Sequence, residues 1–209
     1  MPAPDLDLSP ARRGRVADEL RSSLERAIAG SSFALRGSIA EGRADRYSDI
    51  DAVWRVPGTL QSGFDALPNA AAVVGDVFSV RVAPPELADA DCLVFVTFAD
   101  LPIFWRLDLV IESTAPVGEL TLQLAPPWSL PESALANAVA AVKAVVRGRN
   151  DDAAGLLERG YPRVGARYVA SGSWRTDVER LAAAVGRADA ALEPRAELVR
   201  SVAAALLAG

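Results

Sequence analysis

The chain has 209 residues, of which 51% are hydrophobic and 23% are charged, with a formal net charge of −5 at neutral pH. This length and composition can bury a hydrophobic core, which excludes a disordered chain. The acidic balance argues against a broad nucleic-acid interface, which needs a basic face, and is compatible with a cationic small-molecule substrate. The sequence has no histidine, so histidine base catalysis is excluded.

The single cysteine, Cys92, has no partner for a disulfide within the chain and is expected to be a small buried thiol. The stretch Met1–Asp7 is polar and broken by proline, and no later stretch reaches membrane-spanning length. We therefore expect a cytoplasmic protein that does not associate with a membrane. The oligomeric state stays open.

The first predicted helix begins at Ser9-Pro10 and ends near Gly30, because apolar residues recur every four positions between these points. Several of its arginines are expected to form a solvated face. These are Arg12, Arg13, Arg15, Arg21 and Arg26.

A strand is predicted after this helix, then a second helix interrupted near Pro68, and then three further strands. The predicted strands are 49–56, 77–82, 92–98 and 103–112, and the helix is 63–74. The last two strands are expected to form an antiparallel hairpin through Asp100-Leu101-Pro102.

The proline-rich stretch 125–131 is the best candidate for a linker, because the composition changes from strand-like to helical after it. Ser129 and Glu132 form the pattern of a capping box. Later helices are expected at 153–159, from a cap at Thr176, and after Glu193-Pro194. The predicted fold class is therefore α/β (α+β), with a mixed sheet flanked by helices in residues 1–126 and an antiparallel helical bundle in residues 127–209.

Two short motifs lie between the first helix and the first long strand. Gly37-Ser38 ends an apolar run, and Asp49 and Asp51 alternate with apolar residues. Side chains at i and i+2 lie on one face of a strand, so the two carboxylates point the same way and repel each other unless a cation lies between them. Mg²⁺ prefers such oxygen ligands together with substrate phosphates. A glycine lets the backbone approach a phosphate closely.

Gly37-Ser38, a ten-residue gap and Asp49-Ile50-Asp51 resemble the signature of the nucleotidyltransferase superfamily that includes DNA polymerase beta. The resemblance is closest to its small bacterial members, the aminoglycoside adenylyltransferase-like and minimal nucleotidyltransferases. That family has a third carboxylate on a later strand, which Asp108 matches. Arg36 departs from the pattern, because the position before the glycine is usually apolar in the family.

The resemblance implies an enzyme that moves a nucleoside monophosphate onto a hydroxyl of a small molecule and releases pyrophosphate. AMP from ATP is the expected donor, with GTP and CTP as alternatives, and an aminoglycoside-like antibiotic is one possible acceptor. Asp49, Asp51 and Asp108 would bind two Mg²⁺ ions, and Gly37 and Ser38 would hold phosphates.

Lys143 is the one lysine among 22 basic residues. A chain so rich in arginine has little neutral reason to keep a single lysine, which favours a site that needs a compact point charge. Arg147 lies one helical turn further on the same side, so the two cations could bind the triphosphate. Related adenylyltransferases use a basic residue of this helical region for that purpose. The alternative is a surface lysine with no function.

Other interpretations stay open at this point. Asp108 could form a structural salt bridge with Arg106, and Glu112 could lie at the solvated end of its strand instead of acting as a base. Tyr161 and Tyr168 could stack on a ligand or fasten their loop to the bundle. The chain could also be an antitoxin-type enzyme that adenylylates a partner protein, or a non-catalytic nucleotide-binding module.

Overall fold

The computed structural model describes residues 7–83, 92–113 and 128–207. The chain divides into two compact units, which we call the sheet unit, Asp5–Pro127, and the helical unit, Trp128–Gly209. Residues 125–127 of the predicted linker lie outside the described residues. Each unit is described by itself.

The sheet unit contains a five-stranded mixed sheet in the order β1-β2-β5-β4-β3. Strands β2 and β5 are parallel, and the other neighbouring pairs are antiparallel. The strands are β1 (Ser32–Leu35), β2 (Ile50–Val56), β3 (Val77–Val82), β4 (Cys92–Phe98) and β5 (Leu107–Ser113). The predicted mixed sheet and the predicted β4–β5 hairpin are therefore confirmed.

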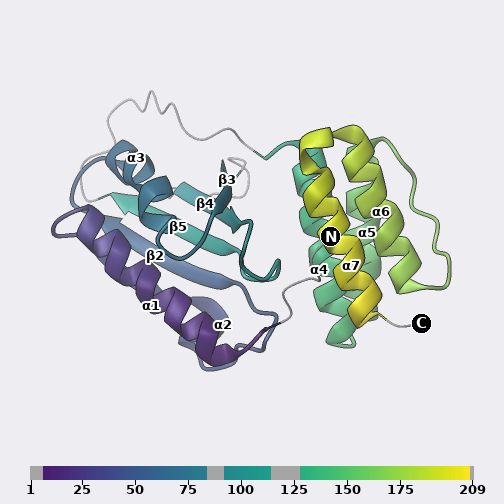
Figure 1. Ribbon diagram of the computed structural model, residues 1–209, viewed down its shortest axis with the longest axis horizontal. Helices are drawn as coiled ribbons and strands as arrows, with labels where there is room; N and C mark the ends of the chain where they lie inside the picture. The colour runs from purple at the N-terminus through teal and green to yellow at the C-terminus, as the bar shows by residue number, and fades with distance from the viewer. Residues whose placement is uncertain (1–6, 84–91, 114–127, 208–209) are drawn as a thin grey trace. The chain divides into compact units, whose positions relative to one another are not determined.

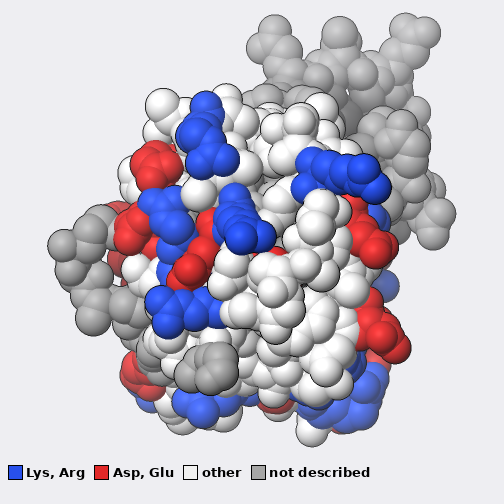
Figure 2. All heavy atoms as spheres, turned by 90° about the vertical axis from the view of Figure 1, so that its right-hand side faces the viewer, with Lys and Arg blue, Asp and Glu red and all other residues white. Residues whose placement is uncertain are grey.

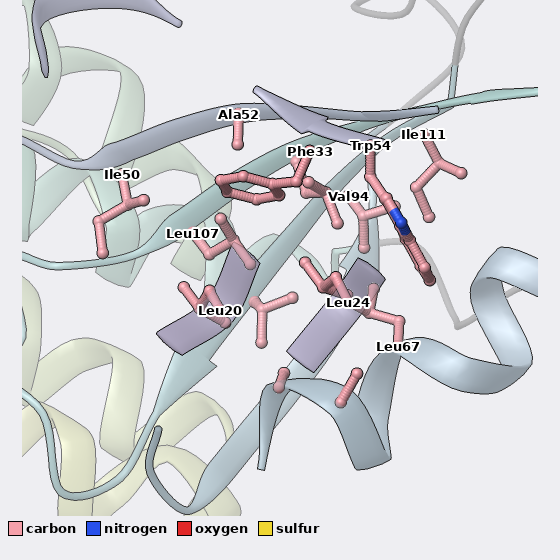
Figure 3. Packing of buried hydrophobic residues seen from close by; sticks show 14 of the residues in the cluster. Leu20, Leu24, Phe33, Ile50, Ala52, Trp54, Leu67, Val94, Leu107 and Ile111 are labelled. Atoms are coloured by element: carbon pink, nitrogen blue, oxygen red, sulfur yellow. The ribbon is translucent and has the colours of Figure 1, made fainter. Parts of the chain in front are cut away.

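Two helices, α1 (Pro10–Ala27) and α3 (Leu60–Ala71), pack on one face of this sheet (Figure 1). Figure 3 shows Leu20 and Leu24 of α1 and Leu67 of α3 facing strand side chains such as Trp54 and Ile111. These five side chains are fully buried, as expected for the main hydrophobic core.

Several predicted boundaries were wrong. Helix α1 ends at Ala27 instead of near Gly30. Helix α3 begins at Leu60, where the hydroxyl of Thr59 accepts from the Ser62 N–H, and it continues past Pro68, whose missing N–H removes only one bond. Strand β5 begins at Leu107, because residues 102–105 form a turn closed by the Trp105 N–H donating to the Pro102 carbonyl.

The helical unit contains four longer helices, as predicted for the C-terminal part. They are α4 (Leu130–Val146), α5 (Asn150–Gly160), α6 (Trp174–Ala188) and α7 (Glu193–Leu206). The capping box of Ser129 and Glu132 at the start of α4 is confirmed. The predicted cap at Thr176 was wrong, because Ser173 caps α6 and accepts from the Thr176 N–H.

A buried carboxylate organises the loop that precedes α6. Asp177 is 2% exposed and accepts hydrogen bonds from the Tyr168 hydroxyl at 3.1 Å and the Ser171 N–H at 3.0 Å. The Tyr161 hydroxyl donates to the backbone carbonyl of the same residue at 2.8 Å. The two tyrosines therefore fasten this loop to α6.

On the face of the molecule shown in Figure 2, basic and acidic side chains are interspersed among uncharged ones. That face therefore presents both signs of charge. Within the residues that the structure describes, no helix is both long enough and apolar enough to cross a membrane.

Candidate functional site

Two of the three predicted aspartates are neighbours across the sheet. Asp51 on β2 and Asp108 on β5 are register partners in the parallel pair. Register partners in a parallel pair lie side by side with their side chains on the same face. That face is opposite α1 and α3, because the flanking Ile50 and Leu107 point into the core. The third carboxylate, Asp49, immediately precedes β2.

Arg106 lies among these carboxylates. Its Nε donates to Oδ1 of Asp108 at 2.5 Å, and its Nη2 donates to Oδ2 at 2.6 Å. The guanidinium also lies over the ring of Phe95, 4.5 Å from its centroid, on the strand next to β5. The salt bridge that the sequence left open as an alternative for Asp108 is therefore present.

The electrostatics show that all three carboxylates lie close to one guanidinium. Burial raises the pKa of Asp108, Arg106 lowers it, and the charges of Asp49 and Asp51 raise it, with a net pKa of about 6. Burial lowers the pKa of Arg106, but Asp108, and then Asp49 and Asp51, raise it by more, so its net shift is upward. A concentration of negative charge is thus partly compensated by one cation.

These residues suit a divalent cation in chemistry, because carboxylate oxygens are the ligands that Mg²⁺ prefers. Carboxylates that converge on one face are typical ligands for Mg²⁺, and the guanidinium shows that the position attracts positive charge. As the side chains stand, no three acidic or cysteine residues of the described chain form a group that could hold a metal ion. Asp108 would therefore need to share its carboxylate with Arg106, or release it, to become a ligand.

Gly37 lies directly against Asp51. Its φ is +56°, in the left-handed region, and a Cβ at this position would lie 2.8 Å from Oδ2 of Asp51. The adjoining Arg36 N–H donates to the Asp51 carbonyl at 2.8 Å. Ser38 follows in the short helix α2 (Gly37–Ala40) and is half-buried. The structure therefore brings the Gly-Ser turn and the acidic face together.

Glu112 is occupied by another partner. Its Oε2 accepts from Nε of Arg55 at 2.6 Å, across the same parallel pair and on the same face as the aspartates. The side chains of Arg55 and Glu112 are 54% and 29% exposed. This placement agrees with the interpretation of Glu112 as the solvated end of its strand.

The two predicted triphosphate ligands belong to the helical unit. Lys143 lies in the last turn of α4 and is 8% exposed, and Arg147 caps the same helix. A lysine so deeply buried is uncommon, which argues against the alternative of a surface residue. Because the units are described separately, their participation in the site stays a prediction.

A buried arginine of α1 is a contributor that sequence reasoning missed. Arg13 was expected on a solvated face, but it is 4% exposed and its Nη1 donates to the backbone carbonyls of Asp45 and Ser48, just before Asp49. The helical spacing could have revealed it, because Arg13 lies three residues before Val16 and seven before Leu20, on the apolar stripe.

No protein-family model matches the chain, and no curated protein matches it. Three solved structures to which the chain is similar are a cytoplasmic RNA terminal U-transferase, the poly(A) polymerase complex GLD-2–GLD-3, and an aminoglycoside 6-adenyltransferase from Bacillus subtilis. The sequence identities are 17%, 12% and 11%, and the TM-scores are 0.38, 0.36 and 0.29.

The matches cover 69%, 83% and 91% of this chain, and 41%, 44% and 97% of the other chains. This chain therefore spans less than half of the first two. The three names are those of enzymes that transfer nucleotides. At these TM-scores the likeness carries no argument, so the proposals below rest on the chain's own residues.

Proposed function

We propose that the protein is a nucleotidyltransferase that transfers a nucleoside monophosphate, AMP from ATP, to a hydroxyl group of a small molecule. The observation that carries the proposal is the pairing of Asp51 with Asp108 on one face of the sheet, beside a glycine that has no Cβ where Asp51 lies. This arrangement joins a carboxylate pair to a glycine turn, and glycine turns are a common means of binding phosphates through backbone N–H groups.

Asp49, Asp51 and Asp108 would hold Mg²⁺. When bound there, the metal would lower the pKa of the attacking hydroxyl and neutralise charge on the phosphates of the leaving group. The carboxylates would orient the reactants around that metal.

The Gly37-Ser38 turn would position the phosphates of the nucleotide. The backbone at Gly37 can approach an oxygen atom closely because it carries no side chain, and Ser38 offers a hydroxyl. Lys143 and Arg147 are proposed to bind the pyrophosphate that leaves, since compact and forked cations both suit phosphate oxygens. A Lys143→Ala variant with unchanged ATP affinity would remove Lys143 from this role.

The activity is tested by measuring pyrophosphate release from ATP with Mg²⁺ across aminoglycosides, lincosamides and other hydroxylated compounds. The proposal predicts acceptor-dependent release that is lost in Asp51→Asn and Asp108→Asn variants. Mass spectrometry of the acceptor should show a gain of one nucleoside monophosphate. Tight binding of a non-hydrolysable ATP analogue without release from any acceptor would instead favour a non-catalytic binding module.

A further inference from the structure

We infer that Arg13 is a positioning residue: from α1 it holds the turn Asp45–Ser48, and thereby fixes the carboxylate of Asp49 at the candidate metal site. The inference rests on the proposed function, because it assigns a role toward the metal that the three aspartates would hold. It concerns how the site is built and not which residues touch the substrate.

The turn is closed by its own side chains. Oδ1 of Asp45 accepts from the Tyr47 N–H at 2.9 Å and from the Ser48 hydroxyl at 3.1 Å. Oγ of Ser48 in turn accepts from the Asp45 N–H at 3.1 Å. The Asp45 carbonyl also accepts from the Ser48 N–H at 3.2 Å, so backbone and side-chain bonds close the turn together.

Arg13 donates the hydrogen bonds that connect this turn to α1. Its Nη1 donates to the carbonyl of Asp45 and to that of Ser48, the latter at 3.3 Å. Burying a guanidinium is costly unless its donors are satisfied, so a 4% exposed arginine that donates to backbone carbonyls is a specific arrangement. Burial lowers the pKa of Arg13, and the charges of Asp45 and Asp49 raise it, which places both carboxylates near its charge.

Trp105 holds the same turn from the side of β5. Its Nε1 donates to the carbonyl of Arg46 at 3.2 Å, and the residue is 1% exposed. The next residue, Arg106, accepts the Ile50 N–H on its carbonyl at 2.9 Å. The segment that leads to Asp108 therefore also fixes the backbone on both sides of Asp49.

Two roles of Arg13 predict opposite changes in the affinity for a divalent cation when Arg13 is removed. If Arg13 only places a positive charge near Asp49, its removal lowers the local repulsion and a divalent cation binds more tightly. If Arg13 positions Asp49, its removal frees the turn and the cation binds more weakly. The sign of the change in affinity therefore separates the two roles.

The test compares the full chain with its Arg13→Met and Trp105→Phe variants, and uses Arg15→Met as the matched control. Arg15 lies on the same helix, is exposed, and carries the same charge. The dissociation constant for Mn²⁺ is measured by electron paramagnetic resonance of the free ion. Hydrogen exchange of the Tyr47 and Ser48 amides reports on the turn, and the unfolding midpoint reports on the fold.

The expected result is Mn²⁺ binding that is weaker by about tenfold in Arg13→Met, the order expected for a lost hydrogen bond from a charged donor. Trp105→Phe, which removes one neutral donor from a well-packed position, should weaken it by about threefold. Both variants should show faster exchange of the two amides, and Arg15→Met should match the wild type in every measurement.

Unchanged or tighter Mn²⁺ binding in Arg13→Met would overturn the inference, and so would faster exchange without weaker binding. If Arg13→Met does not fold, Trp105→Phe decides by the same criteria. A wild-type protein that binds no Mn²⁺ would contradict the proposed function itself, which is a different outcome from a change confined to the variants.

Discussion

The guanidinium of Arg106 holds the carboxylate of Asp108 through two hydrogen bonds, of 2.5 and 2.6 Å. This pair places a fixed positive charge beside Asp49 and Asp51. A cation of the chain itself therefore competes with any metal for the carboxylate of Asp108. Binding of a metal to Asp108 therefore competes with the Arg106–Asp108 pair.

Replacing Arg106 with methionine should strengthen the binding of Mn²⁺ by about tenfold or more, because the competing charge is removed from a partly buried site. Without metal, the variant should lose less than the ~3–5 kcal/mol of stability typical of breaking a fully buried pair, because the two side chains are 24% and 18% exposed. Thermal unfolding with and without Mn²⁺ should show a larger metal-induced increase in the midpoint than in the wild type.

The matched control for this substitution is Arg55→Met. Arg55 pairs with Glu112 on the same face of the sheet, but its side chain is 54% exposed. Its removal should change stability by less than about 1 kcal/mol and leave Mn²⁺ affinity nearly unchanged. Equal effects of the two substitutions would contradict the competition between Arg106 and the metal.

A Gly37→Ala substitution should weaken Mn²⁺ binding, because the new Cβ would lie 2.8 Å from Oδ2 of Asp51 and would displace that carboxylate. The left-handed backbone should add a loss of roughly 1–2 kcal/mol in stability. Calorimetric titration with Mn²⁺ and urea unfolding measure the two effects separately.

Gly42→Ala separates backbone strain from the contact with Asp51. Gly42 has a φ of +67°, but a Cβ there would meet no atom within 4 Å. The two alanine variants should therefore lose similar stability, while only Gly37→Ala loses metal affinity. A matching loss of affinity in Gly42→Ala would show that strain alone is responsible.

In the helical unit, Tyr168→Phe should destabilise the protein by about 1.5–3 kcal/mol, the range for a hydrogen bond to a charged group. The substitution removes one of the donors to the buried carboxylate of Asp177. Tyr47→Phe is the control, because the Tyr47 hydroxyl makes no hydrogen bond among the described residues. This variant should therefore lose little stability. The free energies of unfolding are measured in urea. Equal losses of stability in the two variants would contradict a stabilising hydrogen bond from Tyr168 to Asp177.

Cys92 should react slowly with thiol reagents in the folded protein. Burial raises its pKa from the ordinary 9.0 to about 11, so the thiolate fraction at pH 8 falls by about two orders of magnitude. Alkylation by iodoacetamide should be correspondingly slow and should recover in urea. A rate at pH 8 equal to that of the unfolded chain would contradict the raised pKa.

The same shift has a consequence for stability, because the pKa of Cys92 in the folded state lies above that in the unfolded state. The stabilising contribution of the neutral Cys92 thiol to the free energy of unfolding is fully present below about pH 9. It is lost as the pH rises through about 11. A Cys92→Ala variant should lack this part of the alkaline decline, as measured by urea unfolding across that range.

The sequence predicted the acidic face because the period of a strand separates Asp49 and Asp51 from the buried Ile50 and Ala52. It predicted the strand of Asp108 through the family resemblance. The side-by-side placement of Asp51 and Asp108 depends on the register between β2 and β5, which no local pattern encodes.

The salt bridge of Arg106 and Asp108 is local, since the two residues lie two positions apart at the start of β5, and the sequence could raise it only as an alternative. Arg13 was placed wrongly because arginine on a helix is usually solvated. Its burial follows from the carbonyl groups of a turn more than thirty residues away, which become visible only in the folded chain.

The central claim is that the aspartates of β2 and β5 together bind a divalent cation. It is tested most directly by titrating Mn²⁺ into the wild type and into Asp51→Asn, in the presence of a non-hydrolysable ATP analogue. We predict saturable binding to the wild type and a loss of at least about tenfold in affinity in the variant. Equal affinity in the two proteins, or no binding to either, would contradict the account.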